Sequence, residues 1–229
     1  EQRGAIGEPV DGDAVVDGAD DEAFAGLVDV DGRHRVAELL GDPLQARRES
    51  EQAIALAKSL KHPFSIALAL SFAAWLNHFL HDVEQTRLHA ETALALSLDQ
   101  GFQFWVGWEE IMLGWVHSQQ SHDEKAIHMM RQGLEKWGAT GSNLGVAYFL
   151  TLLTDAYQRH GQIDRALEVL SEAHAFSNRT EERWWQAEQY RLQGELLLQG
   201  ANNTEAEKCF CRDLTLRVAN RRGPWSCAW

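Results

Sequence analysis

The chain has 229 residues, of which 45 % are hydrophobic, so it can bury the core of one large domain or two small ones. Its net charge of −13 argues against a nucleic-acid surface, which would need clustered lysines and arginines. The sequence contains neither a signal-peptide pattern nor an apolar run of about 18 residues, which excludes a predicted membrane span. The three cysteines (Cys209, Cys211 and Cys227) form no disulfide framework, so we expect a cytoplasmic protein.

The first segment, residues 1–40, differs in composition from the rest of the chain. Residues 1–42 hold twelve Asp or Glu against three Arg, so most of the net negative charge lies here. The segment has neither helical periodicity nor strand alternation, and we expect it to be irregular, with disorder as one alternative. Residues 29–38 resemble a calcium loop only superficially, because Leu27 occupies the first ligand position.

From residue 41 to residue 218 the sequence repeats every forty residues. Breakers separate two helical stretches in each unit, as at 160–162 and 200–203, and strand patterns are absent. We therefore predict an all-α solenoid of helix pairs, in which small residues let paired helices approach closely. The recurring small positions are Ala46, Thr86, Ala126, Ala166 and Ala206; Ala53, Ala93, Gly133 and Ala173; and Ala74, Gly114, Thr154 and Gly194.

The order of large and small residues within a unit resembles the tetratricopeptide repeat. The fourth unit shows this best, with Leu153, Tyr157, Ala166 and Ala173 at the corresponding places. A forty-residue period exceeds the usual length of about 34, so we expect each helix to be longer by about one turn. The predicted fold is thus a tetratricopeptide-like helix-pair solenoid with a 40-residue period.

Three stretches also resemble a known protein family: GFQFWVGWEEIMLGWVHSQQ (101–120), LGVAYFLTLLTDAYQRHGQIDRALEVLSEA (144–173) and ERWWQAEQYRLQGELLLQ (182–199). They are similar to the C-terminal tetratricopeptide region of bacterial multidomain signalling proteins. Those proteins join an adenylate/guanylate cyclase-type or LuxR/MalT-like regulatory portion to a STAND-class P-loop ATPase. The resemblance covers roughly residues 40–218 and is most specific over 101–199.

The resemblance implies an interaction and sensing module whose chemistry lies in upstream domains. The chain has no G-x-x-x-x-G-K-[ST] phosphate loop and no cyclase metal-carboxylate segment, so we predict no enzymatic activity and no cofactor. We expect it to bind a protein, a peptide or the upstream domains of its own polypeptide, without contacting nucleic acid or membrane. The alternative is a small-molecule (inducer) sensor of a MalT-like transcriptional regulator. The oligomeric state stays open.

One stripe on the first helix of each pair is expected to face the concave side of the solenoid. Exposed aromatic residues in such a groove are typical of peptide recognition, although packing in the core is the alternative for each of them. Trp184 is predicted to lie in the groove, whereas Trp185 shares a stripe with Leu192 and is predicted to be structural. The partner-binding candidates are Trp75, Trp108, Ile111, Trp115, Tyr148, Trp184, Glu188 and Arg191.

The remaining features give weaker signals. Histidines such as His78 and His81 have tempting spacings but fall at helix ends and turns, where solvated polar residues are ordinary, so we predict no metal site. The glycine-rich residues 138–145 follow no strand and are expected to form a loop. Residues 219–229 abandon the repeat pattern, and a shifted reading frame is one hypothesis for this tail.

Overall fold

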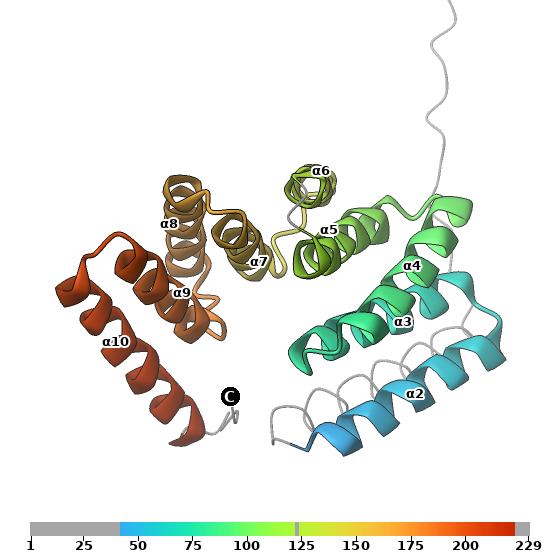
Figure 1. Cartoon of the computed structure of the whole chain (residues 1–229). Helices are drawn as coiled ribbons and strands as arrows, with labels where there is room; N and C mark the ends of the chain where they lie inside the picture. The colour runs from blue at the N-terminus through green and yellow to red at the C-terminus, as the bar shows by residue number, and fades with distance from the viewer. Residues whose placement is uncertain (1–41, 122–123, 223–229) are drawn as a thin grey trace, which may run out of the picture.

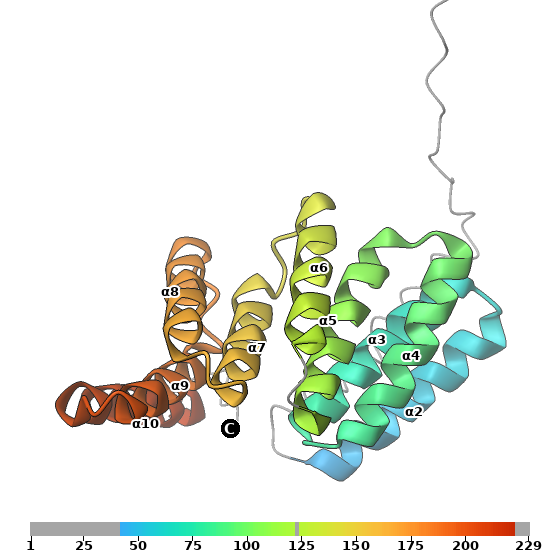
Figure 2. The same ribbon diagram turned by 45° about the horizontal axis from the view of Figure 1, so that its top comes forward.

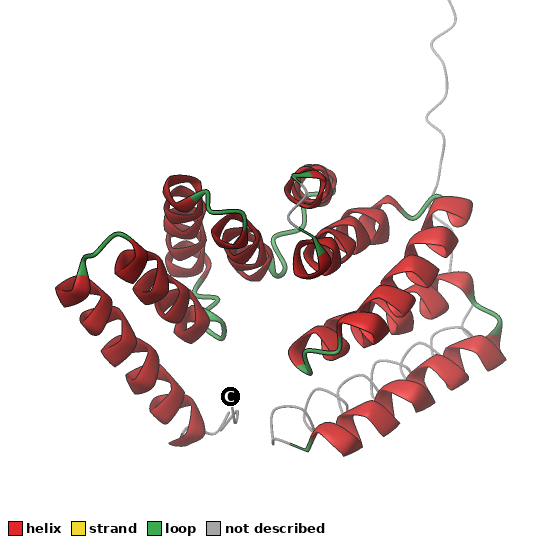
Figure 3. Cartoon of the chain, viewed as in Figure 1, coloured by secondary structure: helices red, strands yellow, loops and turns green. Residues whose placement is uncertain are grey.

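The computed structural model describes residues 42–121 and 124–222, and within these ranges every regular element is an α-helix (Figure 3). The all-α prediction is therefore confirmed for the described part of the chain. The helices are α2 (Pro43–Leu60), α3 (Pro63–Phe79), α4 (Val83–Gln100), α5 (Gln103–Gln120), α6 (Lys125–Ala139), α7 (Val146–Arg159), α8 (Ile163–Thr180), α9 (Gln186–Gln199) and α10 (Asn203–Arg222).

Only some of the predicted segment boundaries lie within the described residues and can be compared with these helices. Residues 1–40, including the superficial calcium-loop match, lie outside the described residues. The first helix in the described part of the chain, α2, begins at Pro43. At the other end α10 continues past Val218 to Arg222, so it enters the predicted tail (219–229), whose last residues, 223–229, are not described.

The helices form two layers of an arch (Figures 1 and 2). The inner layer consists of α3, α5, α7 and α9, and each of these helices touches the next one in that order. The outer helices α4, α6, α8 and α10 each pack on the inner helix that precedes them in the chain, and α2 packs on α3. Within the described ranges no two outer helices are in contact, but α4, α6 and α8 each pack also on the inner helix that follows them, so both layers join successive helix pairs.

Local sequence explains where several helices begin. The Asp42 carboxylate accepts a hydrogen bond from the Gln45 amide (2.9 Å), and Asp82 accepts one from the Gln85 amide (3.1 Å). Such side chains satisfy amides at a helix start that have no partner within the helix. Pro63 occupies the first turn of α3, as the sequence predicts, because that position needs no amide hydrogen.

The turns follow the sequence prediction only in part. Gly161 has the left-handed conformation expected after a helix, with φ of 70°. Gly200 lies at the corresponding place after α9, but its φ is −84° and Ala201 takes the left-handed conformation instead (φ 58°). A further turn, in which Glu181 is left-handed, comes before α9, so this helix begins only at Gln186.

Small residues bring paired helices into close contact, as the repeat pattern predicts. A Cβ atom added to Gly114 of α5 would lie 2.4 Å from the Met130 Cγ atom and 2.9 Å from the Ala126 carbonyl oxygen of α6. A Cβ atom on Gly133 would lie 2.7 Å from the Gly107 carbonyl oxygen. These distances are too short for any side chain, so α5 and α6 pack backbone against backbone.

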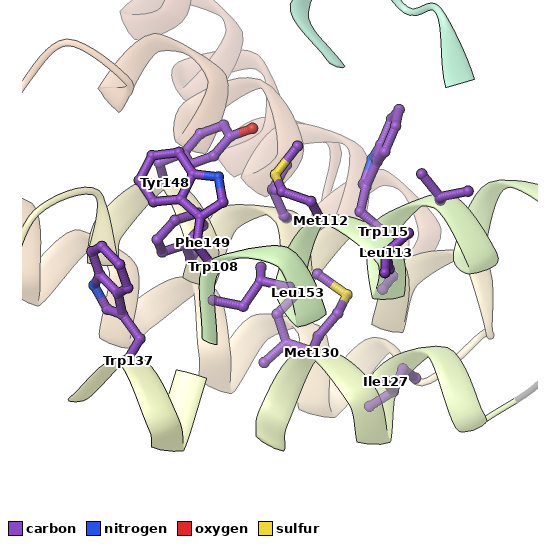
Figure 4. Close-up of a cluster of buried hydrophobic side chains, with 14 of the residues drawn as sticks. Trp108, Met112, Leu113, Trp115, Ile127, Met130, Trp137, Tyr148, Phe149 and Leu153 are labelled. Carbon is purple, nitrogen blue, oxygen red and sulfur yellow. The ribbon is translucent and has the colours of Figure 1, made fainter. Parts of the chain in front are cut away.

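Aromatic rings fill the space between neighbouring inner helices. The Trp75 ring of α3 lies 5.3 Å from the Trp108 ring of α5 and 5.7 Å from the Tyr148 ring of α7, measured between centroids. The Trp108 ring also meets Phe149 at 5.0 Å and Trp137 at 5.4 Å. Figure 4 shows the side chains of Trp108, Tyr148 and Phe149 gathered together. We call Trp75, Trp108, Tyr148, Phe149 and Trp184 the aromatic cluster.

Beside this cluster the acidic side chain of Glu109 in α5 is fully buried. Burial raises the pKa of Glu109 to about 8, because removal from water disfavours the charged carboxylate. The Ser71 hydroxyl opposes this increase only in part, since it donates its hydrogen bond to the Ala67 carbonyl oxygen (2.9 Å). Glu109 is therefore largely protonated at neutral pH.

The close contact between α5 and α6 can be tested with two matched alanine substitutions. Gly114→Ala should lower the free energy of unfolding by about 1–3 kcal/mol, because the new methyl group meets backbone atoms that cannot move away. The control is Gly138→Ala in α6, where an added Cβ atom has nothing within 4 Å. This control should raise the stability by up to about 1 kcal/mol, since alanine favours the helix. Urea unfolding measures both, and equal effects would contradict the close packing.

Candidate functional site

A cavity of about 310 Å³ opens on the inner layer. All four inner helices contribute to it: Phe79 from α3, Trp115 from α5, Asp155 from α7 and Arg191 from α9. The outer helix α10 adds Arg217. The side chains at this one place therefore come from positions spread over more than a hundred residues of sequence, and only the curvature of the arch brings them together.

The floor of the cavity is aromatic. Trp115 is 5 % exposed, and its ring lies 4.4 Å from the His78 ring in an edge-on arrangement. His78 is 6 % exposed, and its Nδ1 atom shares a hydrogen bond of 2.9 Å with the Tyr148 hydroxyl group. Phe79 and Trp185 complete the floor, with ring centroids 5.4 Å apart.

The histidine in this floor is held in its neutral form. Burial lowers the pKa of His78 to about 3, because a charged imidazolium would lose its hydration there, and the neighbouring His81 lowers it further. At neutral pH the ring therefore carries no charge. It acts as a hydrogen-bonding group with one nitrogen that donates and one that accepts.

A network of ion pairs forms the rim of the cavity. Glu188 accepts hydrogen bonds from Nε (2.8 Å) and Nη2 of Arg191, and a longer one from Nη2 of Arg217 (3.4 Å). Arg217 also pairs with Asp213, and Arg191 pairs with Glu195. These contacts raise the pKa of Arg191 further, first through its hydrogen bonds to Glu188. Each guanidinium group is therefore fixed in position by a carboxylate.

A further ion pair between an arginine and a carboxylate lies on α7. The Arg159 Nε atom donates to the Asp155 carboxylate at 2.8 Å, and the Gln119 side chain of α5 donates to the same oxygen at 3.3 Å. Asp155 thus links two inner helices at the edge of the cavity. The rim combines acidic and basic groups, so it suits a ligand or partner that carries charge.

Five of the eight predicted partner-binding residues are buried, which is the core-packing alternative and not exposure in an open groove. Trp75 is 7 % exposed, Trp108 1 %, Ile111 0 %, Trp115 5 % and Tyr148 0 %. The inner helices touch one another directly, and these side chains fill the contact instead of standing in an open groove. Of the five, only Trp115 lines the cavity.

The pair Trp184–Trp185 also differs from the prediction. Both residues precede α9, so the helical geometry that was used to separate them does not apply. Trp184 packs in the aromatic cluster, with its ring 5.6 Å from Tyr148, whereas Trp185 lines the cavity together with Leu192. Both tryptophans pack against the core, and Trp185 also lines the cavity, so the predicted separation into one groove residue and one structural residue does not hold. Both are half-buried, and their centroids lie 5.3 Å apart.

The two charged candidates lie where the stripe predicts. Glu188 and Arg191 are half-buried on α9 and belong to the cavity rim. Sequence reasoning missed Phe79 and Arg159, although each lies one turn beyond a stripe position, at Trp75 and Asp155. A longer stripe would have included them. Arg217 lies on an outer helix, and no pattern in the first helices of the pairs indicates it.

Other sequence features have no counterpart at a site. Within the described ranges no three His, Cys, Asp or Glu side chains are grouped as a metal site would require. Residues 138–145 span the end of α6 and the turn before α7, where Gly141 and Gly145 are left-handed. None of the described helices is long and apolar enough to cross a bilayer.

Comparison with known proteins gives a similarity of fold. No protein-family model matches the chain. No curated protein matches it either. Among solved structures, the crystal structure of BtubC (BKLC) from P. vanneervenii is similar, with a TM-score of 0.60 and 19 % sequence identity over 90 % of this chain and 87 % of BtubC. At this identity the similarity concerns the fold alone.

The neutral His78 predicts a specific pH dependence of stability. Between pH 6.5, its ordinary pKa, and about 3, its folded pKa, the unfolded chain binds a proton that the folded chain does not. Folding is therefore favoured above this range, and this contribution is lost as the pH falls through it. The stability advantage of the wild type over His78→Gln should shrink by about 2 kcal/mol from about pH 8 to about pH 5.

Urea unfolding of both proteins at each pH measures this difference. Glu109 is present in both proteins, so its opposite pH dependence cancels. A constant difference between wild type and variant across the range would mean that His78 is not buried as described.

Proposed function

We propose that the chain is a tetratricopeptide-like solenoid of helix pairs with a forty-residue period. The helix starts support this: the inner helices begin at Pro63, Gln103, Val146 and Gln186, which are forty, forty-three and forty residues apart. The longer middle interval falls where the glycine-rich turn of residues 140–145 joins α6 to α7. Solenoids of this kind use an extended concave surface for binding.

The function that we propose is that of a regulatory interaction module in a bacterial signal-transduction protein. The module binds a partner protein, a peptide or an upstream catalytic domain of its own polypeptide through the inner layer, and it has no catalytic activity itself. The observation that carries this proposal is the cavity, because four inner helices contribute an aromatic floor and a charged rim to one place. The bacterial signalling context rests on the sequence resemblance over residues 101–199.

A second candidate function is small-molecule sensing. The cavity volume of about 310 Å³ lies at the lower end of the range for small-molecule pockets, which is about 300–1,000 Å³. Its mixture of apolar walls with a few polar groups is also typical of such pockets. A ligand there would contact all four inner helices and could change how they pack, which is what a sensor requires.

The interaction proposal predicts that a rim substitution weakens binding while a distant one does not. The binding partner to be tested is the polypeptide encoded upstream of this chain in its gene, titrated calorimetrically. Arg191→Gln should weaken binding by about tenfold or more, because it removes charge-assisted hydrogen bonds worth about 1.5–3 kcal/mol.

The matched control is Arg87→Gln. Arg87 makes the same kind of pairs, with Glu84 and Glu91, on the outer helix α4. Binding should change by less than about twofold in this variant, since surface ion pairs contribute little to stability. Equal affinities of the two variants would contradict binding through the inner layer.

A further inference from the structure

A second cavity, of about 290 Å³, lies between helices α8, α9 and α10 and shares no lining residue with the cavity on the inner layer. Among the described residues the outer helices α8 and α10 do not touch each other, although each packs on α9. They therefore leave a groove between them whose floor is α9. We call this cavity the outer groove.

The outer groove lies on the opposite side of α9 from the inner cavity. Tyr190 and Gln193 of α9 line the groove, whereas Glu188 and Leu192 line the inner cavity. Successive residues of a helix point about 100° apart, so this spacing directs the two pairs of side chains to opposite faces. A ligand in the groove would therefore not compete with one in the inner cavity.

Tyr190 holds two nitrogen-bearing side chains at the groove. Its ring lies 4.8 Å from the ring of His174 in α8, measured between centroids. The guanidinium group of Arg212 in α10 lies 5.5 Å from the centre of the same ring. A guanidinium group is attracted to an aromatic ring at such a distance. One tyrosine of α9 thus positions a histidine from one outer helix and an arginine from the other.

Arg212 differs from the arginines of the inner cavity. Arg159, Arg191 and Arg217 each pair with a carboxylate, whereas Arg212 makes no ion pair within the described ranges. None of the described residues that line the groove is Asp or Glu. The exposed guanidinium group of Arg212 therefore keeps its charge and its five N–H donors for a ligand.

The half-buried His174 supplies a polar atom without a partner. Its Nε2 atom is buried and makes no hydrogen bond to any described residue. Burial lowers the pKa of His174, an interaction with the Gln193 side chain opposes this decrease, and the charge of Arg212 adds to it. The ring is therefore neutral at neutral pH. Since buried polar atoms normally have partners, Nε2 indicates a place for a ligand atom.

The other polar side chains of the groove add neutral donors. The Asn178 Oδ1 atom accepts a hydrogen bond from Gln186 Nε2 (3.2 Å), so its amide N–H groups are left to donate. Ser171 contributes a hydroxyl group and Gln193 an amide group. Three helices thus bring N–H and O–H groups to the groove, and the residues that line it bring no negative charge.

This set of donors suits a phosphate group better than a carboxylate. A carboxylate has two oxygen atoms in one plane, and one arginine can bind both. A phosphate group has at least three acceptor oxygens that point in different directions, so donors on several helices can reach it together. Leu167 and Leu170 give the groove an apolar wall for the rest of a ligand. The volume matches the smallest pockets for small molecules, about 300 Å³.

We propose that the outer groove binds a small phosphomonoester, whose phosphate group accepts hydrogen bonds from Arg212, Asn178 and Ser171. The neutral imidazole of His174 carries its hydrogen on either nitrogen, so Nε2 donates a further hydrogen bond to the phosphate. The organic part of the ligand contacts Leu167 and Leu170. This site adds to the proposed function and does not depend on it, because the inner cavity uses other residues.

The experiment titrates the whole chain with phenyl phosphate, benzoate and phenol, which share one ring and differ in the attached group. Phenyl phosphate should bind at least about tenfold more tightly than benzoate, and phenol should bind more weakly than both, because hydrogen bonds to a charged group are the strongest. Calorimetry measures the affinities. Phenyl phosphate should also raise the pKa of His174, followed by NMR, since a negative charge nearby favours the imidazolium form. The resonance that is lost in His174→Gln identifies His174.

Two variants test the arginine. Arg212→Gln should weaken the binding of phenyl phosphate by about tenfold or more, because it removes the positive charge. The matched control is Arg179→Gln in α8. Arg179 also lies over an aromatic ring, at 4.9 Å from the centre of Phe176, but it does not line the groove. Binding should change by less than about twofold in this control. Circular dichroism checks that each variant is folded before titration.

Three results would overturn the proposal: no binding of phenyl phosphate, equal affinities for phenyl phosphate and benzoate, or equal weakening by Arg212→Gln and Arg179→Gln. A further variant, Arg191→Gln, separates this site from the inner cavity. It should leave the binding of phenyl phosphate unchanged, and a loss of affinity in this variant would place the ligand in the inner cavity instead. Failure of the upstream polypeptide to bind leaves this proposal intact, since that experiment concerns the inner layer.

Discussion

The whole structure depends on aromatic packing between the inner helices. Trp75, Trp108, Tyr148 and Trp184 come from α3, α5, α7 and the turn before α9, and their rings meet at 5.3–5.8 Å. Each ring buries a large apolar area, and aromatic pairs add about 0.5–1.5 kcal/mol beyond that burial. Together with the contacts of α4, α6 and α8 with the inner helices that follow them, these rings join successive helix pairs of the arch.

The cavity is a consequence of that curvature. The arched arrangement of the inner helices brings Phe79, Trp115 and Asp155 together with Arg191 and Trp185 at the cavity. Carboxylates pair with the rim arginines there. The aromatic cluster packs the interior on one side, while the cavity keeps polar donors on the other. The side chains that line the cavity belong to four inner helices, which is why we propose it as the site through which a regulatory module would act.

The sequence predicted the parts of the fold that follow from local spacing. The positions of Gly114 and Gly133 indicated the close approach of paired helices, because only small residues permit it. The predicted stripe on the first helix of each pair indicated which residues lie on the inner layer. It did not indicate how exposed these residues are, because the distance between inner helices depends on residues far along the chain. The turn before α9 contains no glycine or proline, and Glu181 adopts the left-handed conformation there without any signal in the sequence. Arg217 reaches the cavity from an outer helix, which no repeat pattern predicts.

Hydrogen–deuterium exchange of the native chain tests the central claim most directly, because amides in a packed core exchange only when the core opens. The account predicts that the amides of α5 from Trp108 to Trp115 and of α7 from Tyr148 to Thr154 exchange slowest in the chain. Those of α2, whose helix contacts among the described residues are with α3 alone, should exchange much faster. Rapid exchange in α5 and α7, comparable with that of α2, would contradict a buried aromatic cluster. It would favour the alternative in which these aromatic residues are exposed in an open groove.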